Sequence, residues 1–277
     1  MNSGSEISPA QARQILDDLT ALIVRAGTEI RAASPATVVR RLKPDQSPVT
    51  AADEASEAVI LRGLARILPN VPVVAEESID ATAPPDLTGS FVIVDPLDGT
   101  REFLAGRDEF TVNLAIVTHG LPVAGIIAAP KLGKLWRGVI GYGAERLRLS
   151  GDAADRPEAI STRSWPDAAV AVVSRSHMDS ATDKFVSGLG PITRVPCGSA
   201  IKFGHIAEGS ADIYPRLATT CEWDVAAGHA LVVAAGGIVT APLGIPLTYG
   251  RAGENFRVPA FVAWGDSGKA ATVKARS

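Results

Sequence analysis

The chain has little of several residue types whose abundance would point to particular classes of protein. Only two cysteines, Cys197 and Cys221, occur among 277 residues, and their spacing fits no metal site. A disulfide framework is therefore excluded, and we expect both thiols to be reduced. The formal net charge of −3 lacks the basic excess of proteins that bind nucleic-acid polymers. The longest weakly polar stretch, residues 226–239, contains His229 and is too short to cross a bilayer.

The N-terminal residues also lack the features of an export signal. Glu6, Asp17 and Asp18 stand where a signal peptide would have a basic start and an apolar core. Hydrophobic residues make up 46% of the chain and charged residues 21%, as in a globular protein with a sizeable core. We therefore expect a cytoplasmic protein without a transmembrane segment, with one large domain or two domains that share an interface.

Hydrophobic spacing predicts mixed helices and strands in the first half of the chain. Residues 9–33 have helical spacing, and a second helix is expected from Thr50, which forms a capping box with Asp53. The polar residues 40–47 between these helices predict an exposed mobile loop. Strands are expected at residues 71–75, 91–94, 111–117, 122–128 and 134–140, the last three as an antiparallel meander.

The polar residues 151–163 are the best candidate for a domain boundary, which we place between residues 157 and 158. Strand and helix patterns alternate beyond it, so we expect an α/β domain over residues 158–277 after an α+β domain over residues 1–157. Strands are expected at residues 168–173, 192–195 and 211–214, and helices at residues 181–189, 200–208 and 225–235.

The densest chemistry lies at residues 94–100, where an apolar strand leads into Asp95 and Asp98. Pro96 restricts the backbone between them, so the two carboxylates can be held at a set separation. Ionised carboxylates aimed at one point repel each other unless a positive charge lies between them. A hard divalent cation with oxygen ligands meets that need, and the Leu97 carbonyl is a plausible further ligand. The N–H groups of the next two residues would suit a phosphate.

Each acidic residue also has an ordinary structural interpretation. Asp-Pro and Asp-Gly pairs are frequent in turns, and an acidic pair such as Glu76-Glu77 usually marks a solvated strand end. Asp224 stands where the N-cap of a helix belongs, and Asp53 could be a first-turn acid that complements the helix dipole. Single residues therefore leave the metal and the structural interpretations open.

Four segments in order resemble the inositol monophosphatase superfamily, which are lithium-sensitive, magnesium-dependent phosphomonoesterases. They are SPVTAAD at residues 47–53, AEES at 75–78, DPLDGT at 95–100 and WDVAAG at 223–228. The resemblance extends from the first helix to about residue 250. It implies a layered αβαβα sandwich of two domains, with the metal-binding carboxylates in the first, substrate-binding residues in the second and the active site between them.

The resemblance also implies a metal centre with two magnesium ions. One ion would lie on Glu76, Asp95 and the Leu97 carbonyl, and the other on Asp95, Asp98 and Asp224, with Glu76 able to reach a weaker third ion. In such a centre one metal lowers the pKa of its bound water and the other neutralises charge on the leaving oxygen.

The implied catalytic residues are Glu76, Asp53 and Thr100. Thr100, oriented by Asp53, would accept and relay a proton from the attacking water. The phosphate would lie on the metals, beside Asp98 and Asp224, and on the N–H groups of Gly99 and Thr100.

Within the superfamily, residues 95–103 most resemble the CysQ-type 3′(2′),5′-bisphosphate nucleotidases, because inositol phosphatases more often carry Thr-Asn in place of Arg101-Glu102. Residues 174–177, 198–203, 207–209 and 213–216 match the same group. The implied substrate is adenosine 3′,5′-bisphosphate, a small phosphorylated metabolite. Positive side chains and a helix N-cap would hold its uncleaved phosphate. The implied substrate-binding residues outside the metal centre are His177, Ser199 (as the N-cap), Lys202 and Arg216.

Alternatives stay open at this point. Lys202 and Arg216 could be surface charges, Ser199 a simple cap and His177 a hydrogen-bonded loop residue. An inositol monophosphatase or a fructose-1,6-bisphosphatase-like sugar phosphatase shares the chemistry, although Leu217 stands where inositol phosphatases tend to have an acid. A non-catalytic metal or nucleotide sensor is the alternative of another class, and the chain is expected to be a monomer or a homodimer.

Overall fold

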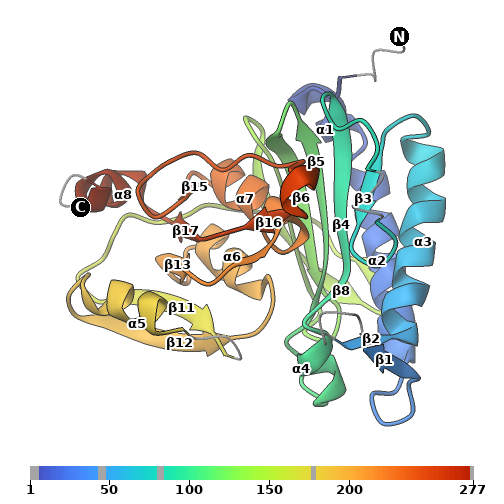
Figure 1. Cartoon of the computed structure of the whole chain (residues 1–277), viewed down its shortest axis with the longest axis horizontal. Helices are drawn as coiled ribbons and strands as arrows, with labels where there is room; N and C mark the ends of the chain where they lie inside the picture. Colours follow the sequence, from blue (N-terminus) through green and yellow to red (C-terminus); the bar gives the residue numbers. More distant parts are fainter. Residues whose placement is uncertain (1–5, 43–47, 80–83, 176–178, 275–277) are drawn as a thin grey trace.

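The computed structural model describes residues 6–42, 48–79, 84–175 and 179–274. Its elements stack as alternating layers of helices and sheets, with α2 (Leu16–Ala32) and α3 (Ala51–Ile67) along one side (Figure 1). A large sheet, a helix pair, a second sheet and an outer pair of helices follow. The αβαβα sandwich expected from the sequence is therefore confirmed.

The first sheet has eight strands, and most of them form an antiparallel meander, as predicted. Its first pair, β3 and β4, is parallel, and every later pairing is antiparallel. The order is β10-β8-β7-β6-β5-β4-β3, with β9 paired to β8. The strands are β3 (Val73–Ala75), β4 (Ser90–Asp98), β5 (Thr111–Thr118), β6 (Leu121–Ala129), β7 (Lys134–Val139), β8 (Gly143–Ser150), β9 (Ala153–Ala154) and β10 (Glu158–Ile160).

The central strands β4, β5 and β6 are buried along almost their whole length, because helices cover both faces of the sheet. On one face lie α1 (Pro9–Gln14), α2 and α3. The predicted helix over residues 9–33 is interrupted at Ile15, and the capping box of α3 is confirmed, since the Thr50 N–H donates to Asp53 Oδ2 at 2.9 Å. On the other face lie α6 (Ile201–Ala207) and α7 (Glu222–Ala234).

The second sheet has the order β12-β11-β13-β17-β15. Its strands are β11 (Ala169–Ser174), β12 (Ile192–Cys197), β13 (Ile213–Arg216), β15 (Ile238–Thr240) and β17 (Phe261–Trp264), and the outer helices α5 (Ser180–Ser187) and α8 (Ser267–Lys274) pack on it. The smaller elements are α4 (Thr100–Leu104), the 3-10 helix η1 (Ala252–Glu254) and two strand pairs, β1 (Arg40–Leu42) with β2 (Pro48–Thr50) and β14 (Thr220–Cys221) with β16 (Arg257–Val258).

Two predicted loops contain strands. The loop prediction for residues 40–47 is wrong at β1, because these residues pair with β2; residues 43–47 lie outside the described residues. The polar residues 151–163 contain β9 and β10, which both pair with β8. This pairing is made by backbone N–H and C=O groups, so it does not require apolar side chains. The division at residues 157 and 158 stays a prediction, and it falls just before β10.

Among the residues that the structure describes, none of the helices combines the length and the hydrophobicity needed to span a membrane. The apolar interior of the described residues includes clusters between neighbouring layers. One apolar cluster lies between the first sheet and α2 and α3, and a second joins that sheet through α6 and α7 to the second sheet. This packing brings the ends of β4, β12, β13 and the start of α7 to one place.

Candidate active site

A cavity of about 330 Å³ opens where the ends of these elements meet. It collects almost every site residue that the sequence predicted. The residues that line it include Glu76, Asp95, Leu97, Asp98, Gly99, Thr100, Ser199, Lys202, Arg216 and Asp224. Asp53 lies behind Thr100 rather than on the cavity wall, and His177 lies outside the described residues.

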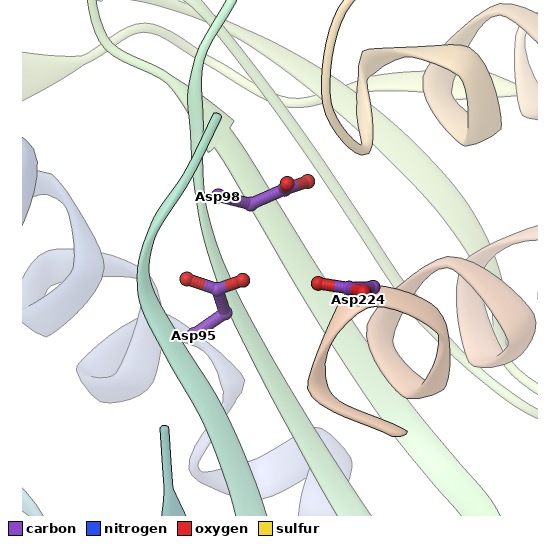
Figure 2. A group of neighbouring side chains, drawn as sticks. All are labelled: Asp95, Asp98 and Asp224. Atoms are coloured by element: carbon purple, nitrogen blue, oxygen red, sulfur yellow. The ribbon is translucent and has the colours of Figure 1, made fainter. Parts of the chain in front are cut away.

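Asp95, Asp98 and Asp224 converge on one point in the cavity. One carboxylate oxygen from each lies within 4.8 Å of the others, and Figure 2 shows the two β4 side chains facing Asp224 at the start of a helix. In a regular strand, residues three apart point to opposite faces. The register of β4 against β5 shifts between Asp95 and Asp98, and this irregularity lets both side chains reach the same side.

Two hydrogen bonds hold the backbone between the two aspartates. The Leu97 N–H donates to Asp95 Oδ1 at 3.0 Å, which fixes the carboxylate against its own turn. Ser56 Oγ on α3 donates to the Pro96 carbonyl at 2.8 Å. The sequence analysis missed Ser56, whose single signal is its place three residues after Asp53 on the same helix.

Asp224 is placed by a different cap from the one expected. The N-cap of α7 is Cys221, and Asp224 is the third residue of the helix, so the prediction of Asp224 as N-cap is wrong. Its Oδ2 accepts hydrogen bonds from the Cys221 N–H at 3.1 Å and from Thr220 Oγ1. Thr220, which the sequence analysis also missed, thereby fixes the rotamer that turns Asp224 into the cavity.

The electrostatics of the cluster show an excess of negative charge. Burial raises the pKa of Asp95 well above its usual range, and the neighbouring Glu76, Asp98 and Asp224 raise it further. Burial and then Asp224 raise the pKa of Asp98 to about 7, although Lys202 opposes the shift. Asp95 Oδ2 is buried and accepts no hydrogen bond from the described residues. An all-oxygen donor set of this charge fits a hard divalent cation.

Asp53 and Thr100 form a hydrogen-bonded pair beside the acid cluster. Thr100 Oγ1 lies 3.0 Å from Asp53 Oδ1 and 3.2 Å from the Leu97 carbonyl, and its one proton can go to either acceptor. Burial raises the pKa of Asp53, against hydrogen bonds from Thr50 and Thr100 that lower it. Gly99 has φ of 94°, which favours glycine, and the backbone turns there to begin α4 at Thr100.

Lys202 on α6 and Arg216 at the end of β13 in the second sheet both line the cavity. Lys202 is buried, and its Nζ donates to the carbonyls of Cys197 and Ser199 while lying 4.9 Å from the centre of the Tyr214 ring. Arg216 Nε is buried and has no acceptor among the described residues. The structure thus excludes the alternative that Lys202 is an ordinary surface charge.

The prediction of Ser199 as an N-cap is wrong, because Ala200 is the N-cap of α6. The φ of Ser199, 42°, lies in the left-handed region, and its buried Oγ has no partner among the described residues. The two thiols, Cys197 and Cys221, are both free, as expected.

Comparisons with known proteins give the family of this chain. The model of the inositol monophosphatase family matches residues 11–260. The 3′(2′),5′-bisphosphate nucleotidase CysQ of Salmonella typhimurium is 40% identical over 219 residues, 79% of this chain and 86% of that protein. CysQ of Escherichia coli strain K12 is 37% identical over 259 residues, 89% of this chain and 98% of that protein.

Solved structures share the same fold. CysQ of Bacteroides thetaiotaomicron superposes with a TM-score of 0.73 at 32% identity, covering 89% of this chain and 95% of that one. The inositol monophosphatase of Anabaena also has a TM-score of 0.73, at 27% identity and 95% coverage of both chains. The match of the family model over most of the chain and the identity to these relatives show that the chain belongs to the inositol monophosphatase family.

Proposed function

We propose that the chain is a 3′(2′),5′-bisphosphate nucleotidase that hydrolyses the 3′-phosphate of adenosine 3′,5′-bisphosphate to give AMP and phosphate. The observation that carries the proposal is the charge of the groups that line the cavity, which include both the acid cluster and the basic side chains of Lys202 and Arg216. The fold alone does not separate nucleotidases from inositol monophosphatases, because both superpose equally well. The higher identity to the CysQ proteins favours the nucleotide.

Magnesium is the cation that we propose for the acid cluster. Two ions would use Glu76, Asp95, the Leu97 carbonyl, Asp98 and Asp224, and Glu76 would also serve a third. These ions, when bound, would supply the positive charge that activates water and stabilises charge developing on the phosphate. The raised pKa values of Asp95 and Asp98 support this, since the charge of a bound cation would offset both the burial and the mutual repulsion that raise them.

The remaining steps use side chains of this chain. Thr100 Oγ1 would accept a proton from the attacking water while its own proton passes to Asp53, 3.0 Å away. Burial raises the pKa of Asp53, which suits a carboxylate that accepts a proton during turnover. The N–H groups of Gly99 and Thr100 would orient the phosphate at the start of α4.

The uncleaved phosphate and the nucleoside would lie against the second sheet. The Nε of Arg216 has no acceptor among the described residues, and Lys202 adds positive charge to the same cavity. Ser199 Oγ and His177 complete the proposed contacts. The proposed division at residues 157 and 158 gives the first domain all the metal ligands except Asp224 and the second domain these substrate contacts.

Release of phosphate with magnesium from adenosine 3′,5′-bisphosphate, inositol 1-phosphate and fructose 1,6-bisphosphate tests the proposal. We expect kcat/KM for the nucleotide to exceed that for inositol 1-phosphate by about a hundredfold, because Lys202 and Arg216 would bind a second phosphate that inositol 1-phosphate lacks. Fructose 1,6-bisphosphate has a second phosphate but no nucleoside, and we expect it to be a poorer substrate than the nucleotide. A preference for inositol 1-phosphate or the sugar bisphosphate would overturn the substrate and keep the metal centre. No release from any of the three would favour a non-catalytic sensor.

A further inference from the structure

The loop of residues 196–199, which comprises the last two residues of β12 and the turn towards α6, is held by charged side chains through its backbone. Each of its four residues has one backbone polar group in such a bond. Arg175 donates to the Pro196 carbonyl at 2.9 Å, Lys202 Nζ donates to the carbonyls of Cys197 at 3.2 Å and Ser199 at 2.5 Å, and the Gly198 N–H donates to Glu109 Oε2 at 2.9 Å.

Two of these side chains, Glu109 and Arg175, bind each other across the two sheets. Glu109 lies between α4 and β5 of the first sheet, and Arg175 follows β11 of the second. Arg175 Nε lies 2.9 Å from Glu109 Oε2, and its NH2 group lies 2.8 Å from Oε1, a bidentate pair. Burial opposes the charge of Glu109, but the hydrogen bonds from Arg175 and Gly198 outweigh it and lower the pKa of the carboxyl.

The approach of the two sheets at this point is close. A Cβ on Gly198 would lie 2.6 Å from the Glu109 carbonyl oxygen and 2.9 Å from Glu109 Cβ, so glycine is required there. The next residue, Ser199, has a φ of 42° and lines the cavity. A left-handed serine persists when its surroundings hold it, and the charged groups around the loop supply those constraints.

We propose that Glu109 and Arg175 are positioning residues, which fix the loop of residues 196–199 so that Ser199 faces the part of the substrate that is not cleaved. This inference rests on the proposed function. Neither residue touches the acid cluster in the structure, and both act through the backbone of the loop. Their loss should therefore weaken binding of the nucleotide more than it slows the reaction.

Arg175→Lys tests the inference, because lysine keeps the charge and cannot form the bidentate pair. Arg163→Lys is a matched control: Arg163 forms a bidentate pair with Asp212 at 2.8 Å and 2.8 Å, and Asp212 also accepts a backbone N–H, from Val170. Arg163 and Asp212 do not line the cavity. Kinetics are measured with adenosine 3′,5′-bisphosphate and with p-nitrophenyl phosphate, which offers only the phosphate to be cleaved.

For Arg175→Lys we expect KM for adenosine 3′,5′-bisphosphate to rise about tenfold, kcat to stay within about twofold, and kcat/KM for p-nitrophenyl phosphate to stay unchanged. Arg163→Lys should leave all three at the wild-type values. Glu109→Gln, which removes the other half of the pair, should repeat the KM effect if Arg175→Lys folds poorly. Circular dichroism and thermal unfolding of each variant give the folded fraction.

Equal losses with both substrates, an effect on kcat alone, or an unchanged KM in folded Arg175→Lys and Glu109→Gln would overturn the inference. The substrate preference of the wild-type enzyme distinguishes failure of this inference from failure of the proposed function. If it prefers inositol 1-phosphate, the proposed substrate is wrong, and the same KM comparison on inositol 1-phosphate decides the role of Glu109 and Arg175.

Discussion

Buried acids occur in two contrasting settings in this molecule. Around the cavity, Asp95, Asp98 and Asp224 face one another, and burial together with their mutual repulsion raises the pKa values of the first two. Between the layers, Glu208 at the end of α6 accepts hydrogen bonds from Trp136 Nε1 at 3.0 Å and from Arg146 at 3.2 Å. Burial opposes its charge, but hydrogen bonds from His205 and Trp136 lower its pKa to about 2.

Asp212 belongs with Glu208, since Arg163 and a backbone N–H satisfy its carboxylate. An acid whose charge is balanced by neighbouring donors holds layers together. A group of acids whose mutual repulsion exceeds what their neighbouring donors offset costs stability until a cation binds, so its placement points to function. Counting acidic residues in the sequence does not separate these two settings, whereas the partners of each carboxylate do.

The largest expected effect is on turnover at the cavity. Asp98→Asn should reduce kcat for phosphate release on the order of a thousandfold, because an amide is a weaker cation ligand and removes one negative charge. Steady-state kinetics with magnesium measure this, with circular dichroism to confirm the fold. Asp212→Asn is the control and should keep the wild-type kcat in the folded protein; near-normal turnover in Asp98→Asn would show that the cluster is not the catalytic centre.

A smaller effect is expected on stability at the layer contact. Glu208→Gln should lower the free energy of unfolding by about 2 kcal/mol, because it weakens the acceptor for Trp136, Arg146 and other donors at a carboxylate that is 8% exposed. Urea unfolding measures the change. Glu158→Gln is the matched control, since Glu158 binds the same Arg146 but is 64% exposed, and it should change stability by less than about 0.5 kcal/mol. Equal losses of unfolding free energy in the two variants would show that burial of Glu208 does not make its contacts more stabilising than those of the exposed Glu158.

The smallest expected effect is a difference in pH dependence without metal. The folded pKa of Asp98, about 7, exceeds its ordinary 3.8. Between these two pH values the folded protein binds more protons than the unfolded chain, so the stability contributed by Asp98 falls as pH rises from 3.8 to about 7. Glu208 has the opposite sign, because its contribution is present above its ordinary 4.5 and is lost as pH falls towards 2. Coupling to Asp95 and Asp224 spreads the proton, so we expect on the order of 1 kcal/mol for Asp98.

Urea unfolding in EDTA at pH 4, 5.5 and 7 checks the sign. Wild type should lose stability from pH 4 to 7 relative to Asp98→Asn, in which the titrating carboxyl is absent. Parallel curves for the two proteins would mean that Asp98 carries no unrelieved repulsion.

The αβαβα fold and the gathering of the acids could be predicted from the sequence, because a few ordered local motifs resemble a family that implies both. The apolar strand before Asp95, the capping box of Thr50 and Asp53, and the segment from Trp223 are short and contiguous. Their order along the chain is the pattern that resembles the inositol monophosphatase family.

The caps around the cavity could not be predicted, because long-range pairing sets them. Asp224 matched an N-cap, but β14 pairs with β16 through Thr220 and Val258, which keeps the chain extended up to Cys221 and fixes the start of α7 at Glu222. Ser199 matched a cap too, and its left-handed backbone depends on a loop that Glu109, 90 residues earlier in the chain, helps to hold. Local sequence carries no record of either contact.

The central claim is that the acid cluster of the cavity binds a divalent cation, and calorimetric titration of magnesium into the metal-free protein tests it most directly. Wild type and Asp212→Asn should bind magnesium alike, and Asp98→Asn should bind it at least about tenfold more weakly. No binding to wild type, or equal binding to wild type and folded Asp98→Asn, would contradict the account.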